Sequence, residues 1–495
     1  MGKIRDTGLI QDEPLIFEQG GEGRRGYSLP EWDIEEVNVR NLIPSNLLRE
    51  ELKGFPQVSE VDVVRHFTRL SQWNYSVDSG FYPLGSCTMK YNPKLNEEVA
   101  RMSGFIHIHP YQPEHLHQGI LKLMVELENF LAEITGMDHV TLQPAAGAHG
   151  ELTGMMMIKA CLQARREKRI KVLVPDTAHG TNCSTSTVAS FQMVEIKSNE
   201  RGVIPLEKVA EQMNEEVAGI MVTNPNTLGL FEEHLAEIAA IVHRKGGFVY
   251  CDGANLNALM GIVKLGNLGV DVVHINLHKT FSTPHGGGGP GSGPLAIKKE
   301  LAPFLPMPVI DKVGETYRFN YDRPQSIGKV RAFYGNFGVL LKAYAYILSM
   351  GAEGLRKASE MAVLNANYLM RRLRGYYYLP YDQLCMHECV FTDRYQEKQH
   401  ISTLDIAKRL IDYGFHPPTI YFPLVVKGAI MIEPTETESK EGLDRFIETM
   451  ITIAKEAEEN PDLLRQAPQR VKVRRLDEVL AARKPKLRWV QTNEI

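Results

Sequence analysis

The sequence predicts an α/β fold, with a mostly parallel sheet wrapped by helices, followed by a smaller α+β domain. Between residues 138 and 278, short apolar runs of strand length alternate with longer segments of helical periodicity. Parallel strands need a crossover connection, usually a helix, so this alternation indicates a parallel sheet. Near residue 325 the pattern changes to long helical segments with few strands. A chain of 495 residues is also too long for a single hydrophobic core.

Residues 1–75 are rich in glycine, proline and charge and show little hydrophobic periodicity. We expect an extended N-terminal arm that packs on a neighbouring chain or on the main domain. At its end, Val64, Phe67 and Leu70 recur at helical spacing, which predicts a short helix over residues 61–75.

Two polar segments follow the arm. Residues 81–93, FYPLGSCTMKYNP, are turn-forming and carry several polar side chains, so this loop is either a connector or the wall of a site. The next segment, IHIHPYQPEHLHQG, contains four histidines, at positions 107, 109, 115 and 117. Histidines suit zinc, but two prolines interrupt the segment and neither an HExxH pattern nor a cysteine pair accompanies it. We therefore expect structural or substrate-facing histidines and no metal site.

The large domain is predicted over residues 76–328. Its strands are predicted at 139–143, 170–175, 192–197, 217–223, 248–252 and 272–277. Its helices are predicted at 150–168, 181–190, 206–214 and 234–245.

The small domain is predicted over residues 329–460. Its helices are predicted at 331–350, 354–374, 403–413 and 442–459, and its strands at 387–392 and 429–433. The tail, residues 461–495, is basic and contains proline, and we expect it to run over the surface.

The composition limits the classes of function. Hydrophobic residues make up 43% and charged residues 23%, which is ordinary for a globular protein, and the formal charge of −4 argues against nucleic acid as the main partner. The sequence contains no apolar run of about 18 residues, so we expect no membrane span. The N-terminus lacks the apolar core of a secretory signal, and the six cysteines are scattered. We expect a cytoplasmic protein with free thiols.

A lysine followed by glycines ends the last predicted strand of the large domain. The apolar run at 272–277 leads into His278-Lys279-Thr280, where the strand is predicted to end, and residues 286–293 contain six glycines. Ligands of α/β proteins bind at the carboxyl ends of parallel strands, and glycines let backbone approach a flat ligand closely. A lone lysine in this position is more often merely exposed, so its assignment depends on partners elsewhere in the chain.

Polar residues also follow the other predicted strands. The turn at 144–150 opens a helix with small residues, which leaves backbone N–H groups available to a phosphate. His179 follows the second strand and can stack on a planar ring. Thr223 ends the fourth strand and Asp252 the fifth. Asp252 alone could also be a helix N-cap.

Together these residues suit pyridoxal phosphate. The pyridine ring accepts electrons only while its nitrogen is protonated, and an ionised aspartate beside the nitrogen favours that state. We therefore predict that Lys279 forms a covalent Schiff base with pyridoxal 5'-phosphate and that Asp252 faces the ring nitrogen.

Six stretches of this chain resemble the glycine dehydrogenase (decarboxylating) family, the P-protein of the glycine cleavage system, and in particular the second, β-type subunit of its two-subunit form. They are YPLGSCTMKYNP at 82–93, LQPAAGAHGE at 142–151, DTAHGTN at 176–182, VTNPNTLGLFE at 222–232, CDGANLNA at 251–258 and NLHKTFSTPHGGGGPGSGP at 276–294. The tail phrase VRRLDEVLAARKPKLRW is similar too. The resemblance implies the aspartate aminotransferase-like fold, fold type I of pyridoxal phosphate enzymes.

The resemblance also implies roles for single residues. Lys279 corresponds to the Schiff-base lysine, Asp252 to the partner of the pyridine nitrogen and His179 to the histidine stacked on the ring. Asn255 and Thr223 would approach the ring hydroxyl and the cofactor edge. The phosphate would be held by four residues: Ala146, Gly147, Ala148 and His278. Single-chain members have a serine where this chain has Ala146, so phosphate binding here must depend more on backbone N–H groups.

The family reaction decarboxylates glycine and transfers the aminomethyl group to the lipoyl cofactor of the H-protein, which makes it an oxidoreductase. The released amine of Lys279, or His179, could move protons. We expect the loops at 82–90 and 286–293 to line a channel for the lipoyl arm. The chain has about half the length of the single-chain form, which implies an α-type partner subunit in an α2β2 heterotetramer. There are two rivals. One is a non-catalytic scaffold subunit, against which the intact Lys279, Asp252 and His179 argue; the other is a different pyridoxal phosphate enzyme, such as a cysteine desulfurase or an amino-acid decarboxylase.

Overall fold

We describe a computed structural model of the chain, covering residues 13–49, 52, 54–109, 112–286, 291–471 and 473–489. The chain divides into two compact units. One comprises residues 1–76 together with 468–495, and the other comprises residues 77–467. Among the described helices, none is both long enough and apolar enough to cross a bilayer.

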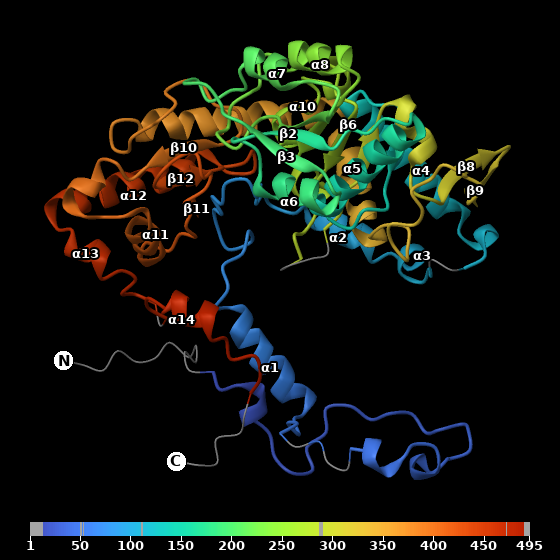
Figure 1. Ribbon diagram of the computed structural model, residues 1–495. Helices are drawn as coiled ribbons and strands as arrows, with labels where there is room; N and C mark the ends of the chain where they lie inside the picture. The colour runs from blue at the N-terminus through green and yellow to red at the C-terminus, as the bar shows by residue number, and fades with distance from the viewer. Residues whose placement is uncertain are drawn as a thin grey trace, which may run out of the picture. The chain divides into compact units, whose positions relative to one another are not determined.

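The larger unit is built on a seven-stranded sheet with the order β1-β7-β6-β5-β4-β2-β3 (Figure 1). The strands are β1 (His139–Thr141), β2 (Lys171–Pro175), β3 (Gln192–Ile196), β4 (Val217–Thr223), β5 (Phe248–Gly253), β6 (Val272–Ile275) and β7 (Leu295–Ile297). The strands β2 to β6 run parallel, and only β7 pairs antiparallel with β6 and β1. The predicted α/β architecture is therefore confirmed.

The central strands β4, β5 and β6 are buried throughout, whereas the edge strand β3 is largely exposed. Helices cover both faces of this sheet. They are α4 (Gln118–Thr135), α5 (Gly147–Ala164), α6 (Gly180–Val188), α7 (Leu206–Gln212), α8 (Leu235–Arg244) and the first part of α10 (Phe337–Leu373). Along β5 successive residues alternate between two cores. Val249 packs in the core that α4, α8 and α10 share, and Tyr250 packs in the core formed with α5.

The C-terminal part of this unit is a three-stranded antiparallel sheet with helices on it. Its strands lie in the order β10-β12-β11, with β10 (Cys389–Thr392), β11 (Thr419–Ile420) and β12 (Ala429–Ile432). The helices that share its core are the second part of α10, α11 (Thr403–Asp412), α12 (Lys440–Glu459) and α13 (Asp462–Arg465). The exact residues at which the large and small domains divide stay a prediction.

The two predicted helices at 331–350 and 354–374 correspond to the two parts of α10. This element spans Phe337–Leu373 but is divided by a kink at Gly351, whose φ of 60° and ψ of 179° are not helical. The helix begins later than predicted because Gly335 has a φ of 74°, outside the helical region. Further elements that the sequence did not predict are α2 (Lys94–Ala100), α3 (Ser103–Ile106), and the hairpin of β8 (Val309–Val313) and β9 (Thr316–Asn320).

The smaller unit is formed by both ends of the chain. Its main helix, α1 (Glu60–Ser71), begins at a capping box of Ser59 and Asp62 and lies close to the predicted range 61–75. The carboxylate of Glu13 accepts hydrogen bonds from Arg69 and lies 2.8 Å from the Nδ1 atom of His66. A short helix of the tail, α14 (Glu478–Arg483), belongs to the same unit.

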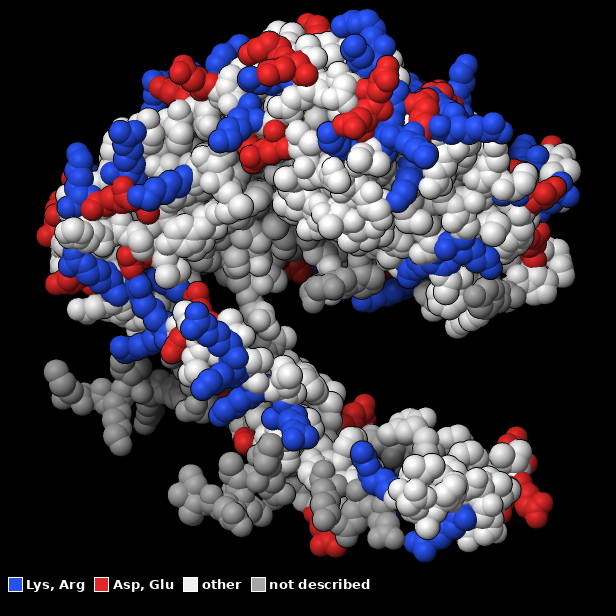
Figure 2. Space-filling model, in the orientation of Figure 1, with Lys and Arg blue, Asp and Glu red and all other residues white. Residues whose placement is uncertain are grey.

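Acidic and basic side chains are interspersed on the face of the larger unit in Figure 2. The larger unit has exposed ion pairs, such as Lys208 with Glu211 at 2.8 Å and Arg201 with Glu233 at 2.7 Å. Exposed pairs of this kind contribute little to stability.

Candidate active site

The predicted polar residues of β4 and β5 lie side by side at the carboxyl edge of the parallel strands. The register pairs Thr223 with Asp252, and Asp252 with His274. Asp252 is buried in the middle of this row. Its Oδ1 atom accepts a hydrogen bond from the backbone N–H of Ala254 at 2.9 Å and lies 3.4 Å from Nε2 of His274. Asp252 is not the cap of the next helix, because that position belongs to Asn255.

A second buried carboxyl group, which the sequence analysis missed, lies beside Asp252. Glu151 on α5 accepts hydrogen bonds from the hydroxyls of Thr181 at 2.6 Å and Thr185 at 3.0 Å. Burial, and then the neighbouring charge of Asp252, raise the pKa of Glu151 to about 8. Glu151, Asp252 and His274 offer ligand atoms within 4.8 Å of one another.

His179 caps the start of α6 at the same edge. Its Nδ1 atom accepts from the backbone N–H of Thr181 at 3.3 Å and lies 2.8 Å from that residue's hydroxyl. Burial lowers the pKa of His179, the charge of Asp252 opposes this, and the charge of Lys279 adds to it. His179 is therefore close enough to feel both charges, and it is neutral at pH 7.

Lys279 does not lie at the end of a strand, which corrects the prediction. The strand β6 ends at Ile275, and Lys279 lies in a one-turn helix, α9 (Leu277–Thr280), where the chain turns beyond the sheet. Its Nζ atom donates to the carbonyl oxygen of Ser86 at 2.7 Å. The segment 81–93, left open between connector and site wall, thus contacts the lysine directly.

Lys90 of the same segment hydrogen-bonds to Thr280, the residue after Lys279. Its ammonium group is buried, donates to the carbonyl of Thr280 at 2.9 Å and pairs with Glu436 at 2.7 Å. The backbone of Ser86 has a φ of 60°, in the left-handed region, where residues other than glycine are uncommon. With this backbone conformation the carbonyl of Ser86 accepts from Lys279, and the N–H of Ser86 donates to the carboxylate of Glu388.

The predicted phosphate turn is a backbone-lined cradle. α5 begins at Gly147 after Ala146, and no side chain of the described residues caps it. A Cβ atom on Gly147 would lie 2.4 Å from Oδ1 of Asn276, and one on Gly291 would lie 2.6 Å from Nδ1 of His278. Both glycines are therefore required by close approach. Ala148 is exposed at this turn.

Several polar atoms around the cradle are buried without a hydrogen-bond partner among the described residues. They are Oδ1 of Asn255, Oδ1 of Asn276 and Oγ of Ser292. Such atoms are rare in folded proteins unless a ligand or water meets them. The Nδ2 atom of the same Asn255 side chain donates to the carbonyl of Pro225 at 2.9 Å. Burial lowers the pKa of His278 to about 3, so it faces the cradle uncharged.

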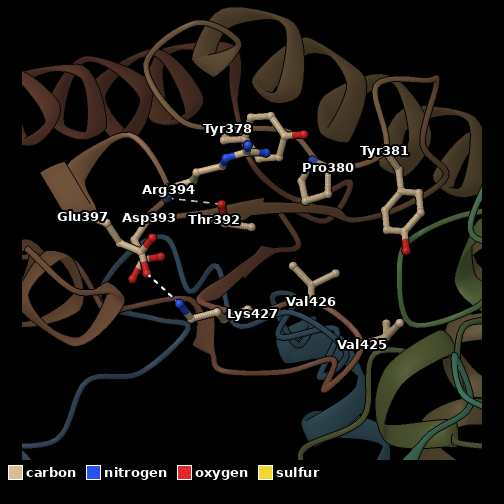
Figure 3. A pocket seen from close by; sticks show the side chains of 10 residues that line it. All are labelled: Tyr378, Pro380, Tyr381, Thr392, Asp393, Arg394, Glu397, Val425, Val426 and Lys427. Atoms are coloured by element: carbon tan, nitrogen blue, oxygen red, sulfur yellow. Dashed lines mark hydrogen bonds and ion pairs between the residues drawn. The ribbon is translucent and has the colours of Figure 1, made fainter. Parts of the chain in front are cut away.

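A surface pocket of about 320 Å³ lies elsewhere, on the C-terminal part of this unit (Figure 3). Its charged groups largely pair with one another: Lys427 lies 3.2 Å from Glu397, and the guanidinium of Arg394 lies over the ring of Tyr378. None of the predicted site residues lines it. We therefore assign the site to the strand ends around Asp252 and Lys279.

Comparison with known proteins agrees with this arrangement. A relative from Caldanaerobacter subterraneus subsp. tengcongensis, named "Probable glycine dehydrogenase (decarboxylating) subunit 2", is 62% identical over 98% of this chain and 100% of its own length. The chain belongs to the glycine dehydrogenase (decarboxylating) subunit 2 family. A relative of the same name from Halalkalibacterium halodurans is 60% identical over 97% of this chain and 99% of its own. Residues 358–471 match the model of the glycine dehydrogenase C-terminal domain, and residues 149–321 match the aminotransferase class-V model.

Solved structures support the same fold. A glycine decarboxylase (P-protein) of the glycine cleavage system superposes with a TM-score of 0.72 at 20% identity, over 84% of this chain and 94% of its own. A cysteine desulfurase from Thermococcus onnurineus NA1 superposes with a TM-score of 0.59 at 16% identity, over 76% of this chain and 95% of its own. At these identities the likeness concerns the fold alone. The fold is that of fold type I pyridoxal phosphate enzymes, as predicted.

Proposed function

We propose that this chain is the pyridoxal-phosphate-carrying subunit of a glycine decarboxylase that passes the aminomethyl group to the lipoyl cofactor of an H-protein and releases CO2. The family is pyridoxal phosphate-dependent and decarboxylates glycine. One observation carries the assignment of the site to this chemistry: Asp252 lies buried between Thr223 and His274 at the sheet edge, and Lys279 lies just beyond the neighbouring strand.

The residues around this edge fit the cofactor. The backbone cradle at Gly147 has no room for a Cβ atom, and buried acceptors at Asn255 and Asn276 have no hydrogen-bond partner among the described residues. The proposed ligands are those predicted from the sequence: Lys279, Asp252, His179, Asn255, Thr223, Ala146, Gly147, Ala148 and His278. When bound, the cofactor supplies an electron sink for the charge that remains after CO2 departs.

The carboxyl groups of Asp252 and Glu151 have different roles in holding protons. Asp252 would favour a proton on the ring nitrogen, because opposite charges stabilise each other at short range. Glu151, with a pKa raised to about 8, keeps its own proton at neutral pH. A protonated Glu151 adds no second negative charge beside Asp252.

Lys279 and His179 are the proposed proton carriers. The amine of Lys279 is held by the carbonyl of Ser86 and is not paired with a carboxylate in the described chain, so it can swing to a ligand. His179 is neutral and has Asp252 within electrostatic reach, so it can accept a proton and have the resulting charge balanced. The aromatic ring of Phe422 meets it edge-on at 5.6 Å, which limits its orientation.

The partners follow from the family. Its members are subunit 2 of a two-subunit enzyme, so a subunit 1 exists. We propose further that the two subunits form an α2β2 assembly and that a lipoylated H-protein docks on it. The loop at 82–90 and the glycine loop at 286–293 are the proposed walls of the lipoyl channel; residues 287–290 lie outside the described part of the chain.

A cysteine desulfurase is the second candidate, since its structures share this fold. That reaction needs a reactive thiolate near the cofactor. Cys87 lies within electrostatic reach of Lys279, but burial raises the pKa of its thiol to about 11. A protonated thiol at neutral pH is a poor nucleophile, which favours glycine decarboxylation.

The test is glycine–CO2 exchange with subunit 1 and a lipoylated carrier supplied. The wild-type chain should exchange CO2 and should show visible absorbance that borohydride abolishes. Lys279→Ala should lose more than nine-tenths of the exchange while it keeps its melting temperature, since the lysine is not part of a core. Asp252→Asn, which can still accept from the N–H of Ala254, should bind cofactor but exchange CO2 poorly. Near-normal exchange in either variant would contradict the assigned roles, and desulfuration of cysteine by the wild-type chain would favour the second candidate.

A further inference from the structure

Three fully buried ionisable residues form a second cluster, which hydrogen-bonds to Ser86 and Thr88 of the 86–88 turn. His387 and Glu388 directly precede β10, and Glu433 directly follows β12. Cys389 pairs with Ile432 in the antiparallel ladder, so the next positions outward, Glu388 and Glu433, face each other. One ligand atom from each of His387, Glu388 and Glu433 lies within 4.8 Å of the other two.

Two carboxylates opposite each other in a dry interior repel, so a proton or a cation has to balance them. Neither Glu388 nor Glu433 forms an ion pair with a lysine or arginine among the described residues. Their hydrogen-bond donors are uncharged, and the positive charge within electrostatic reach of both is that of Lys279, whose Nζ atom donates to the carbonyl of Ser86 instead. Glu388 accepts from the backbone N–H of Ser86 at 2.7 Å, and Glu433 accepts from the backbone N–H of Thr88 at 2.9 Å and from its hydroxyl at 2.6 Å.

The side chain of His387 independently indicates that a ligand binds here. Its side chain is completely buried, and in the described chain neither ring nitrogen has a hydrogen-bond partner. Its Nε2 atom lies 3.6 Å from Oε1 of Glu388, so the ring is directed into the cluster. A buried imidazole normally has at least one of its nitrogens bonded, to the protein, to water or to a metal.

We propose that His387, Glu388 and Glu433 bind one divalent transition-metal cation, Zn²⁺ or Mn²⁺. One imidazole and two carboxylates are a donor set that suits these ions, and two negative charges balance the ion. The hydrogen bonds from Ser86 and Thr88 to the carboxylates match the outer contacts that orient metal ligands in known sites. This cluster is separate from Glu151, Asp252 and His274, which belong to the proposed cofactor site.

The place of the cluster gives the cation a structural role. It would join β10, β12 and the 86–88 turn, whose two left-handed residues, Ser86 and Thr88, have φ values of 60° and 50°. The same turn presents the carbonyl of Ser86 to Lys279 at 2.7 Å. A bound cation would therefore fix the turn that positions the lysine, without touching the reacting groups.

The test is metal content and its position. We expect the full chain, loaded with cofactor and dialysed against metal-free buffer after incubation with Zn²⁺ or Mn²⁺, to retain one equivalent of metal by mass spectrometry. Diffraction at the absorption edge of that metal should give an anomalous peak between His387 and Glu433. The metal should also raise the melting temperature by several degrees, because it binds only the folded chain.

Matched variants separate this site from others. His387→Ala and Glu433→Gln should each retain far less than one equivalent, whereas His234→Ala should retain it all, since His234 is an exposed histidine that pairs with Glu237 on the surface. If His387→Ala does not fold, Glu433→Gln and the anomalous peak decide the question. Retention of the metal by both variants, or a wild-type chain that retains none and shows only a shared proton or a water between the carboxyls, would overturn the proposal.

Discussion

Glu151 gives the sharpest quantitative prediction, because one substitution should change how stability depends on pH. Burial and the charge of Asp252 raise its pKa in the folded chain to about 8, whereas an unfolded chain has the ordinary value of 4.5. Between these two values the folded state holds a proton that the unfolded state has released. Folding therefore takes up a proton, and the free energy of unfolding falls as the pH rises.

The size of this effect follows from the shift. Each pH unit of this difference corresponds to about 1.4 kcal/mol, so the free energy of unfolding should fall by about 2 kcal/mol from pH 6 to pH 8, where the proton begins to leave the folded state as well. The folded unit comprises residues 77–467. At about 2 cal/mol/K of unfolding entropy per residue, a unit of this size should lose about 3 °C in melting temperature over that interval.

Glu151→Gln should remove this contribution. Other buried carboxyls, such as Glu232 with a pKa of about 7, titrate in both proteins, so the difference between the two curves isolates Glu151. Calorimetry on cofactor-free protein at pH 6, 7 and 8 should show the variant losing about 3 °C less than the wild type. Glu128→Gln is the control. The pKa of Glu128 is also about 8, but this residue lies on α4, where it accepts a hydrogen bond from the hydroxyl of Tyr334, and it is not among the proposed cofactor ligands. Its substitution should flatten the stability curve and leave cofactor affinity unchanged. Parallel curves for wild type and Glu151→Gln would refute the reasoning.

Two further substitutions test the cradle and the buried lysine. Gly147→Ala should weaken cofactor binding at least tenfold, about 1.4 kcal/mol or more, because its Cβ atom would lie 2.4 Å from Oδ1 of Asn276. Gly338→Ala, where no atom lies within 4 Å, should leave binding unchanged in the same fluorescence titration. Lys90→Met should cost about 3 to 5 kcal/mol in urea unfolding, because it leaves Glu436 buried without its partner. Adding Glu436→Gln should restore part of that loss, and a cost for Lys90→Met below about 1 kcal/mol would show that the pair is not important.

The sequence predicted the central strands β4, β5 and β6 well because they are buried along their whole length and mostly apolar. Asp252 and Thr223 could be placed together from sequence because each ends such a strand, and parallel strands end at one edge. The helix α4 was not predicted, although Leu127 and Leu131 recur at helical spacing in it. His274 could also have been noticed, as a single histidine in the apolar strand beside Asp252.

Contacts between distant segments could not be predicted in this way. Ser86 and Lys279 are 193 positions apart, and Thr88 and Glu433 are 345 positions apart, so no local pattern links them. Glu151 was visible as the last residue of the phosphate-turn motif, but its effect depends on burial beside Asp252. The predicted strand-end position of Lys279 was wrong because a one-turn helix intervenes, and such short turns have no distinct periodicity.

The charges around Lys279 show why the folded chain needs additional groups. Two buried carboxyl pairs lie within electrostatic reach of the lysine, Glu151 with Asp252 on the sheet side and Glu388 with Glu433 at the 86–88 turn. If all four were ionised, one lysine could not balance them in a dry interior. Glu151 and Glu433 have raised pKa values, about 8 and about 7, so protons supply part of the balance in the chain alone. A protonated pyridine ring next to Asp252 and a cation next to Glu433 would supply the rest, and each would then favour the ordered turn that holds Lys279.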